Sequence, residues 1–405
     1  MPRAGEFEPL GTLVFLQGVL AVLVVAFMFS HADMYISEVR SGPKPVHWVL
    51  VVTAAGVGLM LARANRPMAV LRSPVVAWAG FYLAITLVWY VYAKQSSGLA
   101  NETVTQAVID RFRSMALLVS LLVVFADPLA RRAGYVSLAV TTVFISILNI
   151  LESMGVIVFQ DHYQRTIGRA SGLYGNPNQA GQAIAFGLSL SVFAMPRPYR
   201  LPLLLVGAFG VAATFSRAAI LCIVILVLFH AWRREISLWQ TLSISLLVTV
   251  VLIVASGTLL GMLDSAGTLN QDNLERLAFT ADDSGRAGVA RASWQLFLDS
   301  PVFGNGVAIE RTKFAIYSHN LYVSLAADHG VIGLTLLPAL VMAIAFRNPL
   351  ALPFATILLV IGLFSHNLLD DEYSLVSIAL AAATGFATTG MVLPEREGAF
   401  PDASE

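Results

Sequence analysis

The sequence has little cysteine and little charge. It contains a single cysteine, Cys222, among 405 residues, which excludes a disulfide framework and a cysteine-based metal cluster. Only 12% of the residues are charged and 57% are hydrophobic, a composition that does not fit a set of water-soluble domains. Lysine plus arginine equals aspartate plus glutamate, at 25 each, so no excess of one sign indicates a nucleic-acid partner.

What the sequence does contain is a series of long apolar stretches. Crossing about 30 Å of hydrocarbon takes roughly 20 residues of helix, and stretches near that length recur along the whole chain. About twelve are found, at 10–30, 46–62, 75–93, 112–126, 134–151, 179–195, 201–215, 218–232, 240–263, 331–346, 351–369 and 374–393. The sequence therefore predicts an all-α integral membrane protein. The first stretch is expected to be a retained helix, since no basic segment precedes it.

Arginines in the short connectors predict the orientation in the membrane. Short loops rich in basic residues stay in the cytoplasm. Here they hold Arg63, Arg66, Arg72, Arg131, Arg132, Arg197, Arg200, Arg233, Arg234 and Arg347. The opposite, extracytoplasmic side, which is the periplasm in a Gram-negative cell, receives the longer connectors at 31–45, 94–111, 152–178 and 264–318.

The predicted organisation follows from this alternation. Nine transmembrane helices are expected over residues 1–263, a periplasmic loop over 264–318, three more helices over 319–393, and a cytoplasmic tail over 394–405. Both termini are then cytoplasmic, because an even number of spans returns the chain to the side on which it began.

Residues 201–232 form an apolar run interrupted only by Ser216 and Arg217. Basic connectors flank the run, so it is expected to turn back as a hairpin. Each arm of 15 residues reaches only about 22 Å into a core about 30 Å thick, which places Arg217 below the outer membrane surface. An intramembrane charge is by default functional and faces a watery cavity or an anion. The alternative is an arginine that extends to the interface from a longer helix.

The outer segment 264–318 is expected to contain an amphipathic helix from Arg286 to Asp299. At helical spacing, its apolar stripe consists of Ala290, Trp294, Phe297 and Leu298. This stripe can lie on the membrane or pack on the bundle. Arg286 and Arg291 lie in the first half, where the helix N-terminus favours an anion and the forked guanidinium donors suit phosphate oxygens. The alternative is that they form surface ion pairs with nearby aspartates.

The most specific motif is Ser318-His319-Asn320, followed after nine residues by Gly330-Val-Ile-Gly333 and a transmembrane helix. A histidine near the outer interface can accept a proton from a hydroxyl at neutral pH, and Asn320 can hold the imidazole or a substrate oxygen. A histidine that caps a helix is the structural alternative. A second copy, Ser365-His366-Asn367, is a lesser candidate, because packing or loop anchoring explains it better than catalysis.

A further cluster precedes the predicted span 179–195. It contains Arg169 and the segment Ser171-Gly-Leu-Tyr-Gly-Asn176-Pro-Asn178. Asn176 followed by Pro177 is typical of an N-cap with proline at the first helical position. An open helix N-terminus facing the same cavity would also suit a phosphate or sugar hydroxyls.

Together these segments resemble the bacterial O-antigen ligase superfamily, which includes O-antigen polymerases and protein O-oligosaccharyltransferases. The resemblance lies in the 171–178 segment, Phe-Ser-Arg at 215–217, Arg-x-x-Trp at 291–294 with Pro301 and Gly304-x-Gly306, and His319-Asn320-x9-Gly330-x-x-Gly333. These motifs extend over roughly 171–333, whereas the other spans match only as generic hydrophobic helices.

The resemblance implies a GT-C-like glycosyltransferase of the bacterial inner membrane, acting on its periplasmic face. Its donor is a glycan on undecaprenyl diphosphate. The acceptor is a lipid A-core sugar in a ligase, another lipid-linked repeat unit in a polymerase, and a serine or similar residue in protein-directed members. The His-Asn-x9-Gly-x-x-Gly pattern favours a ligase.

The resemblance also assigns roles to residues. Arg217 and Arg291, or Arg286 in place of Arg291, would bind the diphosphate, and His319 would act on the acceptor hydroxyl. Preformed arginine donors stabilise the charge on the leaving diphosphate, so neither a metal nor another cofactor is expected. A one-step displacement of this kind inverts the anomeric carbon.

Two other classes of protein stay open. An exporter of lipid-linked sugars would use the same cationic cavity without needing His319. A metal-dependent glycosyltransferase would instead use carboxylates, such as Asp282-Asp283 or Asp370-Asp371-Glu372, to hold a hard cation. Removal of His319 separates the first class from the ligase, and sensitivity to a chelator separates the second.

Overall fold

The computed structural model is built of helices. It describes residues 9–62, 70–96, 101–159, 169–233, 239, 286–315, 317–346 and 348–385, and no strand occurs within these ranges. The predicted all-α fold is confirmed for them. Several predicted features lie outside the described residues: the span 240–263, Asp282 and Asp283, the tail 394–405, and the connector arginines Arg63, Arg66, Arg234 and Arg347.

The described helices occur in the following order along the chain. The first half contains α1 (Pro9–Val24), continued by the π-helical turn η1 (Val25–Phe29), then α2 (Ala32–Arg40), α3 (Pro45–Ala62), α5 (Pro74–Ser96), α6 (Asn101–Phe125) and α7 (Pro128–Ser153). Next come η2 (Gly172–Tyr174), α8 (Pro177–Ala194), α9 (Arg197–Ala213) and α10 (Arg217–Trp232). The described part ends with α13 (Arg286–Asp299), α14 (Ile309–Phe314), α15 (Leu321–His329), α16 (Val331–Ala345), η3 (Pro349–Ala351), α17 (Leu352–Gly362) and α18 (Glu372–Thr384).

Many of these helices are apolar enough for a membrane protein. Among the described residues, four are also long enough to cross a bilayer: Gly11–Phe29, Pro45–Ala62, Pro74–Val91 and Pro128–Ser153. Shorter apolar helices are Pro198–Ala213, Arg217–Trp232, Val331–Ala345, Pro349–Gly362 and Glu372–Thr384. The chain is therefore a membrane protein, and the number of twelve spans stays a prediction.

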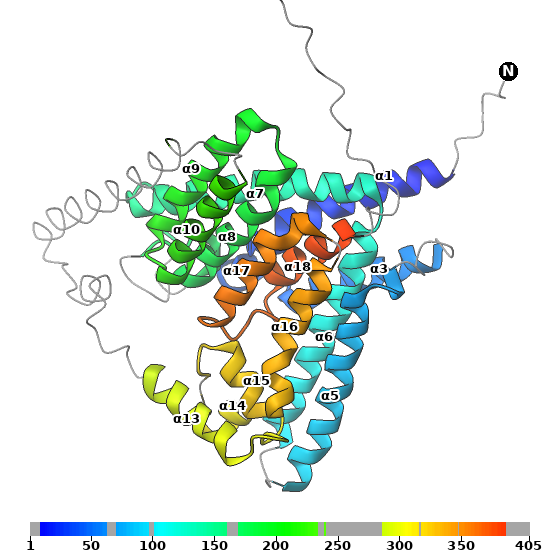
Figure 1. Cartoon of the computed structure of the whole chain (residues 1–405). Helices are drawn as coiled ribbons and strands as arrows, with labels where there is room; N and C mark the ends of the chain where they lie inside the picture. Colours follow the sequence, from blue (N-terminus) through cyan, green and yellow to red (C-terminus); the bar gives the residue numbers. More distant parts are fainter. Residues whose placement is uncertain are drawn as a thin grey trace, which may run out of the picture.

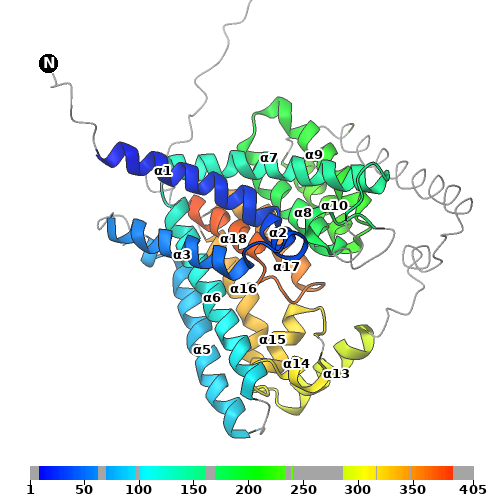
Figure 2. The same ribbon diagram turned by 180° about the vertical axis from the view of Figure 1, so that it is seen from behind.

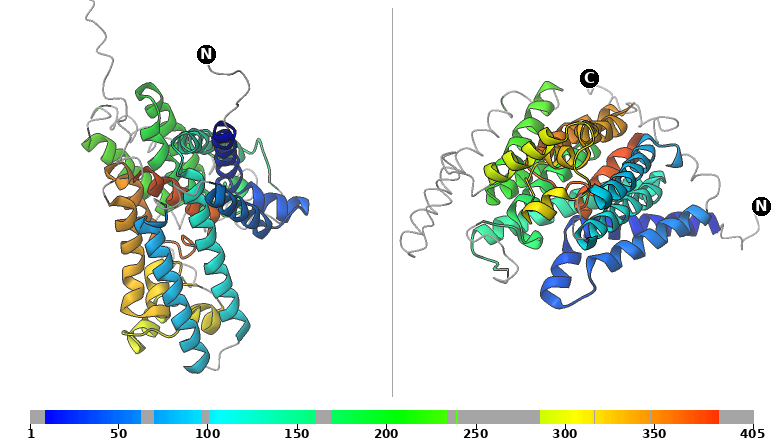
Figure 3. Two further views of the ribbon diagram at one scale, coloured as in Figure 1. Left: turned by 90° about the vertical axis from the view of Figure 1, so that its right-hand side faces the viewer. Right: turned by 90° about the horizontal axis from the view of Figure 1, so that it is seen from below.

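The helices form two arms that meet at a common core. Figures 1 and 2 show α1 and α7 side by side along one end, with α8 and α9 next to α7 and α10 next to α8. From that end α5, α6 and α16 run to the opposite end, where α13, α14 and α15 gather. The view from below in Figure 3 shows α5 and α6 next to each other, as their contacts require.

The core lies where α8 and α18 are enclosed by the other helices. All residues of α18 from Glu372 to Ala383 are buried, and most of them are alanine, serine or medium-sized aliphatic residues. Small side chains let helix backbones approach closely, which supplies the packing that holds helices together in lipid. A Cβ atom on Gly187 of α8 would lie 2.0 Å from Thr142 Oγ1 of α7, so that crossing depends on glycine.

Two predicted boundaries are wrong. The connector predicted at 94–111 is largely helical, because α6 begins at Asn101 and runs without a break into the apolar stretch. The span predicted at 351–369 ends at Gly362, and residues 363–371 form a loop. Leu368 and Leu369, which made that stretch look helical, are buried in the protein core. Hydropathy indicates that these leucines are buried, but it does not distinguish a buried loop from a membrane-spanning helix.

Candidate functional site

The segment 169–178 builds the N-terminus of α8. Gly175 has a φ of +61° and turns the chain so that Asn176 precedes α8 and Pro177 occupies its first position. The Asn176 side chain accepts a hydrogen bond from the backbone N–H of Asn178 at 3.0 Å. The predicted N-cap followed by proline is therefore confirmed.

Arg169 joins this segment to the turn between α9 and α10. Its Nε donates to the Thr214 carbonyl at 2.9 Å, and its Nη2 donates to Asn178 Oδ1 at 3.0 Å and to the Phe215 carbonyl at 3.2 Å. Hydrogen bonds from a charged donor are among the stronger ones in proteins. Arg169 and Asn178, which we predicted as accessory site residues, thus hold the turn before Arg217 against α8.

The predicted hairpin over 201–232 is confirmed, because α9 ends at Ala213, α10 begins at Arg217, and the two helices pack on each other. Phe215 closes the turn with a left-handed φ of +49°. Arg217 is half-buried at the first position of α10. The helix dipole at this end favours an anion and opposes a cation. The arginine and the helix end are therefore suited to act together on an anionic group.

His319 lies at the start of α15 beside His366. The two imidazoles meet edge to face with their centroids 5.0 Å apart, and Tyr317 stacks on His366 at 4.5 Å. His319 is exposed and has a left-handed φ of +54°, whereas Asn320 caps α15 by accepting a hydrogen bond from the Val323 N–H at 3.2 Å. The capping residue of α15 is thus Asn320 and not His319.

Burial and the neighbouring His319 lower the pKa of His366 to about 3, so His366 is neutral at physiological pH. A neutral ring packed between Tyr317 and His319 fits the predicted role of loop anchoring. His366 therefore supports His319 and does not compete with it for protons near neutral pH.

The loop 363–371 connects the histidines to the N-terminus of α8. At one end it carries His366, which contacts His319. At the other end Asp371 Oδ2 accepts a hydrogen bond from the Gln179 amide of α8 at 3.0 Å, and Tyr373 donates to Gln182 at 3.0 Å. Together with the hydrogen bonds of Arg169, these contacts join four segments that are distant in sequence. The segments lie around 169–179, 214–217, 319–320 and 366–373.

The helix that carries the other two predicted arginines is confirmed with the predicted bounds, Arg286–Asp299. Of its predicted apolar stripe, Trp294 and Leu298 are 42% and 51% exposed, which fits the alternative that the stripe lies on the membrane. Ser293 and Leu296 are buried, and α13 packs on α15.

Arg291 is exposed on α13. Its helix packs on α15, the helix that follows His319 and Asn320. For Arg286 the structure places the backbone at the first position of α13. The choice between the two as a diphosphate ligand therefore stays a prediction.

A buried ion pair that the sequence did not reveal fixes the other end of α15. Arg111 of α6 donates from Nη2 to Asp328 Oδ2 at 2.5 Å, and its Nη1 lies 3.0 Å from His329 Nε2. Asp328 also accepts from the backbone N–H groups of Ala308 and Ile309 at 3.1 and 3.2 Å. The sequence did contain a signal for this pair. Asp328 and His329 lie side by side in the mostly apolar segment between Asn320 and Gly330, and an ionisable residue in an apolar segment usually has a specific partner.

The glycines of the motif serve backbone packing. Gly330 has φ +66° and ψ −146°, a region essentially restricted to glycine, and a Cβ there would lie 2.4 Å from the Val302 carbonyl oxygen. A Cβ on Gly304 would lie 2.4 Å from the Asp328 carbonyl oxygen. Residues 301–306 therefore pass directly against the end of α15. The Gly304-x-Gly306 segment therefore has a role in tertiary packing.

Gly333 makes the closest of these contacts. A Cβ at this position would lie 1.9 Å from the Leu325 carbonyl oxygen, so we expect Gly333→Ala to lower the free energy of unfolding by about 1–3 kcal/mol through overpacking. Thermal unfolding of the purified variants in detergent measures this. Gly58→Ala is the matched control, because a Cβ on that helical glycine meets nothing within 4 Å. Equal melting temperatures for the two variants would contradict the prediction.

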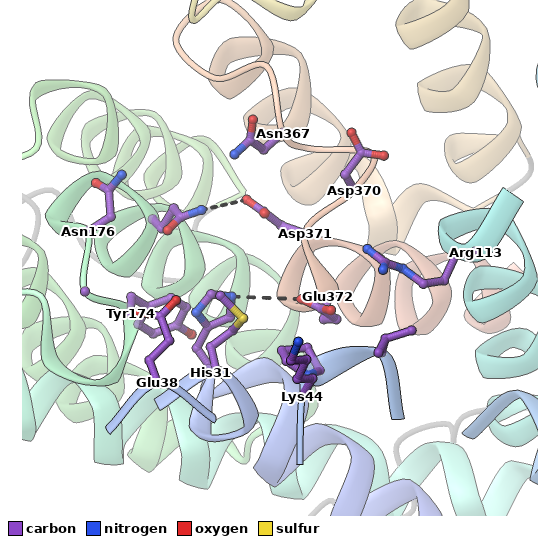
Figure 4. A pocket seen from close by; sticks show the side chains of 15 residues that line it. His31, Glu38, Lys44, Arg113, Tyr174, Asn176, Asn367, Asp370, Asp371 and Glu372 are labelled. Atoms are coloured by element: carbon purple, nitrogen blue, oxygen red, sulfur yellow. Dashed lines mark hydrogen bonds and ion pairs between the residues drawn. The ribbon is translucent and has the colours of Figure 1, made fainter. Parts of the chain in front are cut away.

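A cavity of about 470 Å³ opens beside the N-terminus of α8. Its lining comes from α2, the start of α3, α6, and the segments 174–179 and 367–372 (Figure 4). It includes Asn176, one of the predicted site residues, and Asn367, the neighbour of His366. The cavity therefore adjoins both the α8 segment and the loop that holds the histidines.

The carboxylates considered as metal ligands have separate partners. Asp371 binds Gln179, the Ser114 hydroxyl donates to Asp370 Oδ1 at 3.4 Å, and Glu372 Oε2 lies 4.0 Å from His31 Nε2. In the part of the chain that the structure describes, no group of three histidine, cysteine, aspartate or glutamate side chains is arranged to hold a metal ion. Asp370, Asp371 and Glu372 thus do not form a ligand set in this structure.

Comparison with known proteins supports the motif analysis. Residues 202–338, about a third of the chain, match the model of the O-antigen ligase family. The match confirms the predicted resemblance and includes the motifs at 215–217, 291–294 and 319–333, whereas the 171–178 segment precedes it. Members of this ligase and polymerase family are glycosyltransferase-like enzymes. No curated protein matches the chain.

Proposed function

We propose that this chain, with its O-antigen ligase-family region at 202–338, transfers a glycan from undecaprenyl diphosphate to a sugar hydroxyl of lipid A-core. The observation that carries the proposal is the loop 363–371. It contacts His319 through His366 and binds the N-terminus of α8 through Asp371. The loop thereby links the proposed proton acceptor to the N-terminus of α8, and Arg169 joins the segment before α8 to the turn that precedes Arg217.

The roles of the residues follow from the chemistry of the displacement. The acceptor oxygen bonds to the anomeric carbon while the bond from that carbon to the diphosphate oxygen breaks, which inverts the carbon. His319 takes the proton of the acceptor hydroxyl. Arg217, together with Arg291 or Arg286, binds the departing undecaprenyl diphosphate and stabilises its charge without a metal or another cofactor.

The proposed setting is the bacterial inner membrane, with twelve spans, both termini in the cytoplasm and the site open to the periplasm. The starts of α9 and α7 are then cytoplasmic, and they carry Arg197, Arg200, Arg131 and Arg132. The partners are the lipid-linked glycan, the lipid A-core acceptor and the surrounding lipids, with no nucleic acid among them.

The test is a transfer assay with the purified full-length protein in liposomes. It is given an undecaprenyl-diphosphate glycan and lipid A-core, with and without EDTA. We expect glycosylated lipid A-core in equal amounts in both samples. We also expect Arg217→Ala to raise the donor KM about 10- to 100-fold through loss of charged hydrogen bonds. Arg200→Ala, a half-buried arginine whose Nε binds the Met195 carbonyl, is the matched control and should leave the KM unchanged.

Three other outcomes would each indicate a different function. Longer lipid-linked glycans without modified core would identify a polymerase that uses the same donor. Loss of transfer in EDTA would identify a metal-dependent transferase. Absence of transfer together with movement of the lipid-linked glycan across the vesicle membrane would identify a transporter.

A further inference from the structure

The cavity beside α8 differs in charge from the turn between α9 and α10, which carries Arg217. Four carboxyl groups line it, those of Glu38, Asp370, Asp371 and Glu372, against two basic side chains, Arg113 and Lys44. Arg113 is in turn near Asp110, with Nη2 and Oδ1 3.4 Å apart. Carboxyl groups therefore outnumber cationic groups in the lining, so a diphosphate would bring its charge to a place where further negative charge is unfavourable.

The base of the cavity is rigid and polar. His31 stacks on Tyr174 with ring centroids 4.9 Å apart, and both side chains are buried (Figure 4). The Tyr174 hydroxyl donates to the Phe29 carbonyl, so its ring is locked in place. His31 Nε2 faces Glu372, but the other ring nitrogen, Nδ1, is buried without a hydrogen-bond partner. A buried polar atom of this kind is costly unless a ligand or water satisfies it.

Amide and carboxyl groups surround this base. Asn176 and Gln179 come from the α8 side, and Asn367 and Asp371 come from the loop 363–371 (Figure 4). Such side chains can both donate to and accept from hydroxyl groups. Burial and the adjacent Glu372 raise the pKa of Asp371 to about 8, so additional negative charge is already unfavourable at this position.

We propose that this cavity is a sugar subsite of the transfer reaction, which holds one uncharged sugar by its hydroxyl groups and rejects acidic sugars and phosphate. A volume of about 470 Å³ lies within the usual range for small-molecule sites, roughly 300–1,000 Å³. The inference rests on the proposed function, and it adds the class of sugar that the site accepts. The sugar belongs to either the donor glycan or the lipid A-core acceptor.

Direct binding tests the subsite without any transfer. Saturation-transfer NMR on the full-length protein in nanodiscs compares methyl glucoside with methyl glucuronide, which differ by one carboxylate. We expect the glucoside to bind at least about tenfold more tightly. Asp371→Ala should weaken glucoside binding about 10- to 100-fold, as expected for a lost hydrogen bond to such a group. Asp299→Ala, an exposed aspartate on α13, is the matched control and should change nothing.

Kinetics then identify the source of the sugar. A raised acceptor KM in Asp371→Ala, with an unchanged donor KM, places lipid A-core in the cavity, and the reverse places the donor glycan there. Unchanged binding of undecaprenyl diphosphate to this variant shows that it is folded.

Two outcomes separate the subsite from the proposed function. Binding of glucoside without any transfer would support the sugar subsite and contradict the proposed ligase function. Normal transfer, with equal affinity for glucoside and glucuronide or with no effect of Asp371→Ala on binding and both KM values, would overturn the subsite alone.

Discussion

Replacing His319 by alanine is expected to lower kcat/KM for glycan transfer by about 10²- to 10⁴-fold, the usual contribution of a positioned general base. His319 is exposed at the start of α15, and the capping of that helix is done by Asn320. Its removal should therefore disturb the chemistry more than the fold. The rate of product formation in the liposome assay and the melting temperature of the variant measure the two effects separately.

The control for this prediction is His47→Ala, an exposed histidine at the start of α3. It should keep the wild-type rate within about twofold, because surface substitutions usually have small effects. Since burial holds the pKa of His366 near 3, His366 should contribute no ionisation to the pH–rate profile between pH 5 and 8. A rate in His319→Ala within a few-fold of wild type would rule out the proposed proton transfer to His319.

Breaking the buried pair between Arg111 and Asp328 should cost about 3–5 kcal/mol of stability, because the remaining charge is left buried without its partner. The two side chains meet at 2.5 Å, and their exposed fractions are 12% and 3%. Arg111→Ala, Asp328→Ala and the double variant form a thermodynamic cycle that gives the coupling energy. Thermal unfolding in detergent, with expression level as a second readout, measures each variant.

The control pair consists of two neighbours of Arg111 in α6 whose side chains are more exposed. Arg113 and Asp110 are 3.4 Å apart, and their side chains are 35% and 28% exposed. Solvent screens such a pair, so Asp110→Ala should cost less than about 1 kcal/mol. Because Asp328 holds the end of the helix that begins beside His319, its loss should also reduce transfer. Equal stability loss in Asp110→Ala and Asp328→Ala would contradict the role of the buried pair.

Much of the local structure was predictable from the sequence. The N-cap at Asn176, the hairpin on either side of Ser216 and the helix from Arg286 to Asp299 all occur as expected. Each depends on residues within a few positions of one another, such as an asparagine before a proline or two polar residues inside an apolar run. The family match rests on the same kind of local motif.

Other features were not predictable because they depend on distant residues. Hydropathy assigned residues 363–369 to a span, although Leu368 and Leu369 are buried in a loop. The buried residues of α13 were also not predictable, since Ser293 and Leu296 are buried whereas Trp294 and Leu298 of the apolar stripe are exposed.

By itself, the sequence determined that the chain is an all-α membrane protein, which helix ends are capped, and which motifs carry the family resemblance. The tertiary structure alone decided that Arg111 meets Asp328, 217 positions away, that His319 lies against His366, and that a cavity rich in carboxyl groups forms beside Asn176. The physical reason is that periodicity and capping act between neighbours in the chain. Buried ion pairs, ring contacts and cavities arise only when packed helices bring distant side chains within a few ångströms.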